Sequence, residues 1–240
     1  MSKLDKHQLV GKLVALLREA ELDQFYDFDD AVTQAKNMMV REAKQVELTD
    51  LEMLFDSQIA TLKDRGVPEP IVEILQNQKG AVVKKASEMT IGGGNIPFLP
   101  VIPRLYRSPY DLIAMVRNGS KVGYTCVNPT AISDVVDTPQ EPYYIYDVED
   151  GNATLGKSPE AAEKIFKQQK RSPLTAAEAM ALTTHTDVLS RHYVWASGSR
   201  YGCADRVPDV WLDGGDRPEL DWSRVDGSDD RWGSASCGSR

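Results

Sequence analysis

The chain has 240 residues, of which 41% are hydrophobic and 27% charged, an ordinary globular mixture with enough apolar mass for a packed core. Its formal net charge of −8 argues against nucleic-acid binding, which needs Lys and Arg to neutralise phosphates, and against docking on an anionic membrane. The length fits one large domain or two small ones.

The cysteines and the N-terminal stretch bear on location. Cys126, Cys203 and Cys237 are odd in number and widely spaced, which is not a disulfide framework. Polar residues interrupt the apolar stretch within residues 1–22, and no small-residue cleavage site follows it. No run approaches the ~20 apolar residues that span a bilayer. We therefore expect a soluble, cytoplasmic protein without a membrane partner.

Residues 1–90 carry apolar side chains at helical spacing and predict four helices. The third begins after Thr49 as its cap and ends at Gly66. The fourth runs from Glu69 towards Lys85, with Gly80 weakening its middle. The first two helices are expected to begin near Ser2 and near Asp29 or Asp30.

The segment IGGGNIP, residues 91–97, interrupts this pattern. Three consecutive glycines carry too large a backbone entropy cost for a helix or strand interior. A phosphate-binding loop would need a preceding strand and a following helix, whereas a helix precedes and a proline-broken segment follows. We interpret the segment as a linker between a helical region, 1–90, and an α+β domain, 97–240.

Beyond the linker, helices and short strands alternate. Strands are expected at 98–102, at 121–127 and at 143–148, and the last of these is expected to return through 153–155 as a hairpin. Helix starts are expected at Ser108-Pro109, at Ser158-Pro159 and at Thr175, where Glu178 completes a capping box and the helix runs towards Leu189.

The region after His192 is expected to consist of β-strands. It holds all four tryptophans, spaced 16, 11 and 10 residues apart with Asp-Gly turn signals between them, which is typical of an antiparallel meander in which Trp232 packs against the others. The predicted fold is α+β: a helical N-terminal region, then a domain with a mainly antiparallel sheet and a C-terminal β meander. The tryptophans are Trp195, Trp211, Trp222 and Trp232.

Four stretches show a resemblance to a known family: FDSQIATLKDRG, RSPLTAAEAMALTTH, GSRYGCADRVPDVW and WGSASCGSR. The segment from about 55 to 240 resembles a family of uncharacterised bacterial proteins, frequent in actinobacteria and known only as a domain of unknown function. Residues 1–48 lie outside the resemblance, and DRPELDWSRV is longer than the turn expected before Trp222. The resemblance implies no activity, cofactor or catalytic residue.

One function class is a Cys/His-dependent hydrolase or transferase. Cys203 or Cys237 would be the nucleophile and His185 or His192 the base, with Asp187 or Asp205 orienting it. No cysteine-protease signature or nucleophile elbow supports this, and a free cysteine is usually a small buried hydrophobe. No metal site is expected, because the two histidines would lie ~10 Å apart along one helix and the acidic loops lack calcium-loop spacing.

The other function class is non-enzymatic binding. After Lys170 the chain has eight arginines and no lysine. These arginines either pair with the nine acids of 205–230 and pack on tryptophans, or line a site for a small anionic ligand or a partner's carboxylate. In the second case the two Gly/Ser segments, 197–200 and 234–240, meet on neighbouring strands or loops. The predicted ligand-binding residues are Ser197, Ser199, Arg200, Arg206, Ser234, Ser236 and Arg240.

We expect this binding protein in preference to the enzyme, with cofactor unknown. A third hypothesis gives residues 1–90 a role as a helical docking element for a protein partner.

Overall fold

The computed structural model describes residues 48–240, so the helices predicted near Ser2 and near Asp29 or Asp30 lie outside the described residues. Residues 51–240 form one compact unit. The helical stretch up to Glu88 and the following β-strands belong to this same unit. The division at residues 91–97 stays a prediction about chain organisation.

Three helical segments open the described chain. Residues 48–64 are helical, so Thr49 lies inside the helix and the prediction of Thr49 as its cap is wrong. Gly66 ends the segment with a φ of 71°, and the N–H of Val67 donates to the carbonyl of Leu62, as in a Schellman cap.

The predicted fourth helix is divided into α3 (Glu69–Gln76) and α4 (Lys79–Glu88). The break lies at Gln78, whose side-chain amide donates to the carbonyl of Pro142, 2.8 Å away. The break interrupts a pattern that looks continuous in the sequence, and Gly80 lies in the first turn of α4.

The glycine segment forms a loop that folds back onto the body of the protein. The N–H of Gly92 and the side-chain amide of Asn95 both donate to the carboxylate of Asp147, at 2.8 and 2.6 Å. Arg171 donates to the other oxygen of that carboxylate at 2.5 Å. The loop connects α4 to β1 (Ile96–Val101), which pairs antiparallel with β6 (Tyr143–Val148).

The hairpin predicted after β6 is wrong. Gly151 has a φ of 107°, and residues Asn152–Thr154 form the 3-10 helix η3 instead of a returning strand. The partner of β6 is β1, almost fifty residues earlier in the chain, a pairing that no local signal indicates.

The main sheet has five strands in the order β12-β8-β10-β11-β4. β8 (Tyr193–Trp195), β10 (Arg206–Leu212) and β11 (Pro218–Arg224) pair antiparallel, as predicted for a meander. The edge strands β12 (Trp232–Ser234) and β4 (Tyr124–Thr125) pair parallel to their neighbours. The α+β class is confirmed. The last strand of this sheet, β12, pairs with β8, whereas a meander would place it next to β11.

The remaining elements flank this sheet. Of three short strand pairs, two join distant segments and the third is the local β2–β3 hairpin; two 3-10 helices lie in loops. The pairs are β2 (Arg117–Asn118) with β3 (Lys121–Val122), β5 (Ile132–Asp134) with β9 (Ser199–Tyr201), and β7 (Ser172–Pro173) with β13 (Ser236–Cys237); the 3-10 helices are η2 (Pro129–Ala131) and η4 (Val188–Ser190).

Three helices follow the glycine loop, and all three predicted caps are confirmed. Ser108 caps α5 (Pro109–Ile113) and Ser158 caps α6 (Pro159–Gln169). Thr175 and its capping box begin α7 (Ala176–His185), which ends before Leu189 because Thr186 already has extended backbone.

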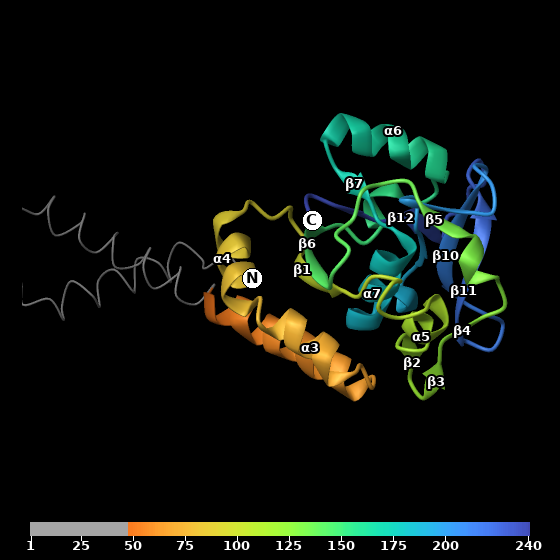
Figure 1. The fold of residues 1–240 in the computed structure, drawn as a ribbon. Helices are drawn as coiled ribbons and strands as arrows, with labels where there is room; N and C mark the ends of the chain where they lie inside the picture. Colours follow the sequence, from red (N-terminus) through yellow and green to blue (C-terminus); the bar gives the residue numbers. More distant parts are fainter. Residues whose placement is uncertain (1–47) are drawn as a thin grey trace, which may run out of the picture. The chain divides into compact units, whose positions relative to one another are not determined.

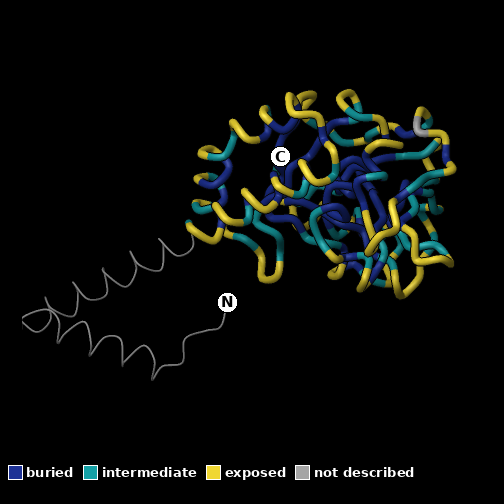
Figure 2. Tube along the Cα trace, turned by 90° about the horizontal axis from the view of Figure 1, so that it is seen from below, coloured by how far each residue is buried: buried dark blue, intermediate teal, exposed yellow. Residues whose placement is uncertain are grey.

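Helix α7 is the centre of the core. Every residue from Ala176 to Thr184 is buried, because the helix lies between the β1–β6 pair and the five-stranded sheet (Figure 1). The tube in Figure 2 shows buried segments gathered inside the β-rich part and exposed ones on its loops and turns. Residues 48–240 contain no helix with the length and apolar character needed to cross a membrane.

The two faces of the main sheet differ in composition. Val194, Val210 and Leu220 lie on one face and are fully buried. On the other face Trp232 stacks on Trp195 at 5.4 Å between ring centroids. The predicted packing of Trp232 against the earlier tryptophans is thereby confirmed, although Trp222 points to the opposite face and stacks on Tyr201.

Candidate functional site

A cleft of about 800 Å³ opens between two loops and the start of α7. One wall comes from Arg104 and Leu105, between β1 and α5, and from Tyr110 in α5. The other wall comes from residues 128–140, and the floor includes Tyr143 of β6 and Thr175, the cap of α7. The volume is within the range of ~300–1,000 Å³ that is usual for small-molecule sites.

The wall near β5 is held by an ion pair and a buried serine. Arg104 donates to the carboxylate of Asp134 at 2.8 Å and to the carbonyl of Ile132 at 2.6 Å. The hydroxyl of Ser199 donates to the second oxygen of Asp134 at 2.6 Å, and accepts from the N–H of Ala176 at 2.9 Å. Charge-assisted contacts of this kind fix the orientation of Arg104 and Asp134 in the cleft.

The floor depends on a second buried network. The hydroxyl of Tyr143 donates to Glu178 at 2.8 Å, and Glu178 binds the Nε and Nη2 of Arg240 at 2.7 and 2.8 Å. The second oxygen of Glu178 also accepts from the N–H of Thr175. Burial, followed by the charge of Glu178, raises the pKa of Tyr143 far above its ordinary value, so the tyrosine remains a hydrogen-bond donor.

The two Gly/Ser segments do meet, as the sequence predicted. The hydroxyl of Ser197 donates to that of Ser234 at 2.9 Å. Both serines are buried, as are Ser199 and Ser236, so the predicted ligand-binding hydroxyls lie inside the core.

The glycines of these segments allow the close approach. A Cβ on Gly233 would lie 2.0 Å from the carbonyl oxygen of Gly151, and one on Gly198 would lie 2.6 Å from that of Pro173. Backbone packing therefore explains why glycine occupies these positions.

The arginines predicted for anion binding have internal partners. Arg200 donates to Glu163 at 2.7 Å and to the carbonyls of Ser197 and Ala204. The guanidinium of Arg206 lies 4.0 Å from the ring centroid of Trp222, a cation–π contact. Arg240 likewise binds Glu178. These contacts favour the first explanation of the arginines after Lys170, in which they pair with acids and pack on tryptophans.

The two cysteines of the enzyme hypothesis have raised pKa values. The exposed Cys203 donates to Asp205 at 2.8 Å, and this hydrogen bond to a carboxylate raises the pKa of the thiol. Burial raises the pKa of Cys237 to about 12. Neither environment stabilises a thiolate, which is the nucleophilic form of cysteine.

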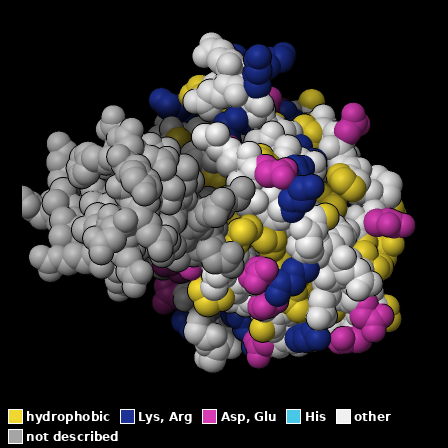
Figure 3. All heavy atoms as spheres, turned by 90° about the vertical axis from the view of Figure 1, so that its left-hand side faces the viewer, with side chains coloured by type: hydrophobic (Ala, Val, Ile, Leu, Met, Phe, Trp, Pro, Cys, Tyr) yellow, Lys and Arg dark blue, Asp and Glu magenta, His cyan; other side chains and the backbone are white. Residues whose placement is uncertain are grey.

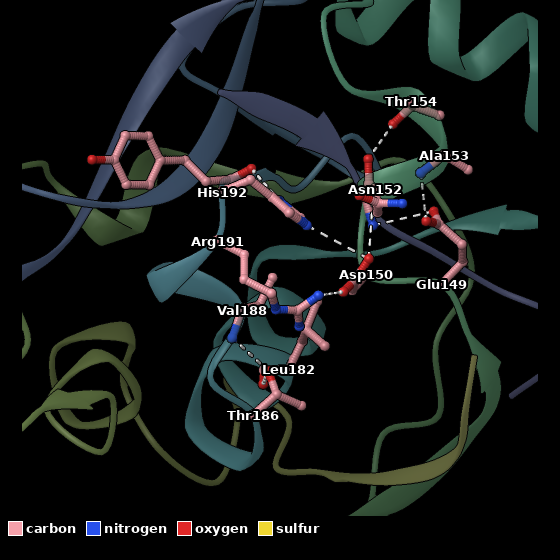
Figure 4. Close-up of polar contacts among 12 residues, drawn as sticks. Glu149, Asp150, Asn152, Ala153, Thr154, Leu182, Thr186, Val188, Arg191 and His192 are labelled. Carbon is pink, nitrogen blue, oxygen red and sulfur yellow. Dashed lines mark hydrogen bonds and ion pairs between the residues drawn. The ribbon is translucent and has the colours of Figure 1, made fainter. Parts of the chain in front are cut away.

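The histidines lie apart from these thiols in the hydrogen-bond network of residues 48–240. His192 is buried and its Nε2 lies 3.6 Å from Asp150, which also binds Arg191 at 2.9 Å; Figure 4 shows both side chains pointing towards Asp150. Burial of Asp150 is outweighed by His192, Arg191 and the N–H of Asn152, which together lower its pKa to about 2. This is a local ion cluster that holds the segment after β6 against η4.

Within the described part of the chain, no group of three or more His, Cys, Asp or Glu side chains is arranged to hold a metal ion. Comparison with family models gives one match over residues 54–240, to a family of unknown function (DUF5701). The chain belongs to this family. No curated protein and no solved structure matches it.

The family match spans the cleft and both networks beneath it. Sequence reasoning identified Ser199, Arg240 and the Thr175–Glu178 capping box, but did not connect them with a cleft. It missed Arg104, Asp134 and Tyr143, which lie in three separate segments and have no shared motif.

Proposed function

We propose that the chain is a non-enzymatic ligand-binding protein whose ligand occupies the cleft formed by residues 103–110 and 128–140. One observation carries the proposal: the polar groups of the cleft are fixed before any ligand arrives. Arg104 is held by Asp134, and Tyr143 is held by the buried Glu178. Pre-organised groups reduce the entropy lost on binding.

The charges of the cleft argue against an anionic ligand. Arg104 is already paired with Asp134, and Asp137 adds a second carboxylate to the lining. Hydroxyl and amide groups contribute the remaining polar lining, while Leu105 and Tyr110 at the rim are 77% and 54% exposed. A small molecule with several hydrogen-bonding groups and one apolar side fits this lining.

An anion site in the C-terminal meander has less support, because its serines are buried and the forks of Arg200 and Arg240 bind internal partners. The Cys/His enzyme has less support still, since both thiols have raised pKa values. A docking role for residues 1–90 stays a prediction.

The proposal also includes a cytoplasmic location, in line with three free cysteines, and a partner that is neither nucleic acid nor membrane. The face shown in Figure 3 supports the second point, because Lys and Arg side chains lie beside Asp and Glu instead of gathering into one basic patch.

The test is a calorimetric titration with a set of uncharged polyols and small amides. We expect at least one to bind, and we expect Tyr110→Ser to weaken its binding because Tyr110 lines the cleft. Tyr106→Ser is the matched control, since Tyr106 is exposed nearby but does not line the cleft. Equal affinity of all three proteins for every bound compound would refute the cleft as the binding site.

A further inference from the structure

A second cavity, of about 390 Å³, lies where the end of helix 48–64, strand β2 and the C-terminal end of α7 come together. Its lining includes Arg65, Arg117 and His185, one from each of these segments. None of the three belongs to the cleft or to the networks beneath it.

Two buried polar groups that border this cavity lack partners. Neither ring nitrogen of His185 has a hydrogen bond within residues 48–240, and both are shielded from solvent. The Nε of Arg65 is also buried without a partner. Because more than about 90% of buried polar groups in proteins are hydrogen-bonded, these two side chains can gain hydrogen bonds to a ligand if they turn towards the cavity.

The charges around the cavity favour an anion. Arg65 and Arg117 share the single carboxylate of Asp64, at 2.7 and 3.8 Å. That carboxylate is 66% exposed, so solvent screens it. Asp187, the acid that lines the cavity, is more exposed still and pairs with Arg191. The two guanidinium groups are thus incompletely neutralised on the cavity side.

The threonine hydroxyls at the C-terminal end of α7 line the cavity but do not donate hydrogen bonds to a ligand. Thr183 and Thr184 both donate to the carbonyl of Met180, and Thr186 donates to that of Leu182. Their protons are engaged within the turns of α7, so they have none to offer a ligand. The remaining donors include the arginine forks and the imidazole N–H, which match the oxygens of phosphate or sulfate.

We propose that the cavity formed by Arg65, Arg117 and His185 binds a small tetrahedral oxyanion of the phosphate type, either free or as the terminal group of a larger molecule. Arg65 and Arg117 supply the charge, and His185 donates a hydrogen bond once its ring turns, because both ring nitrogens now face away from the cavity solvent. The site is separate from the proposed ligand cleft, so either proposal can fail without the other.

The test is a calorimetric titration of the full chain with inorganic phosphate, and separately with sulfate and methyl phosphate. We expect saturable phosphate binding and at least about a tenfold loss of affinity in Arg117→Ala. Lys121→Ala is the matched control, because it removes one positive charge from the same β2–β3 hairpin without lining the cavity, and it should change affinity by less than about twofold.

His185→Gln and a spectroscopic readout test the imidazole separately. In protein labelled with nitrogen-15 in histidine, phosphate should shift the His185 ring signals and leave those of His192 in place. Comparable affinity for methyl phosphate would show that the anion is the end of a larger molecule, and rejection of the ester would show that it is the free ion. The proposal fails if phosphate and sulfate do not saturate any site below about 10 mM. It also fails if Arg117→Ala and Lys121→Ala lose affinity equally.

Discussion

Replacing Arg240 by alanine should destabilise the protein strongly, because it removes the charge that balances a buried carboxylate. The side chain of Glu178 is fully buried and that of Arg240 is only 12% exposed. After the change, Glu178 would keep the hydroxyl of Tyr143 and the N–H of Thr175 but no cation in contact. Breaking a buried ion pair by removing one partner costs about 3–5 kcal/mol.

Urea unfolding followed by tryptophan fluorescence measures this effect. A loss of about 3–5 kcal/mol is a fifth or more of the ~5–15 kcal/mol by which a typical domain is stable. For a unit of this size it corresponds to a melting temperature lower by roughly 6–20 °C. Arg224→Ala is the control: its side chain is 62% exposed and pairs with Asp226, so its removal should cost less than about 1 kcal/mol.

A double-mutant cycle separates the ion pair from the packing of the arginine side chain. Glu178→Gln keeps the size of the side chain and removes its charge, so Arg240→Ala should cost much less in that background than in the wild type. Additive effects, or an Arg240→Ala protein as stable as Arg224→Ala, would refute the assignment of Glu178–Arg240 as a tightly coupled buried pair.

Three further predictions concern single positions. Burial raises the pKa of Asp209 well above its ordinary value. As pH rises, the carboxyl of Asp209 loses its proton in the unfolded chain at a lower pH than in the folded protein. The free energy of unfolding should therefore fall between pH ~3.9 and the pKa of the folded state. Asp209→Asn should flatten this dependence on pH, measured by urea unfolding at several pH values. Gly233→Ala should lower the melting temperature measured by circular dichroism, because its Cβ would lie 2.0 Å from the Gly151 oxygen. A thiol reagent should label Cys203 in the folded protein only as pH rises above neutral, and Cys237 only after unfolding.

Each of these has a result that contradicts it. An Asp209→Asn protein with an unchanged slope of stability against pH would mean that this carboxyl is not held protonated by burial. Normal stability of Gly233→Ala would show that the contact between the segments around Gly151 and Gly233 can widen at no cost. Fast labelling of Cys203 below about pH 7 would indicate a thiolate and restore the enzyme hypothesis.

Local signals in the sequence predicted the elements that depend on local physics. The sequence predicts the caps at Ser108, Ser158 and Thr175 because a hydroxyl, or a glutamate three residues on, accepts from the free N–H groups at a helix start. A proline in the first turn has no N–H group to satisfy. Strand β6 was found from its apolar run, but its partner β1 was not, because pairing depends on contacts distant in the sequence.

The site was less accessible to prediction for the same reason. Arg104, Asp134 and Tyr143 are isolated polar residues in unrelated segments, and only the packing of β5 against β9 and of β6 beside α7 brings them together. The excess of arginine was visible, but sequence alone left open whether the guanidinium groups bind internal or external partners. The internal contacts of Arg200 and Arg240 answer that for two of them.

The segment from Arg231 to Ser239 hydrogen-bonds to three strands, β6, β7 and β8, through backbone groups alone. During synthesis these three strands leave the ribosome well before that segment, and until it arrives their edges have unpaired N–H and C=O groups. A nascent chain interrupted before residue 231 therefore has exposed strand edges beside an aromatic sheet face, which is the combination that promotes aggregation. Successful production of this protein thus depends on translation passing residue 239 as much as on the stability of the finished fold.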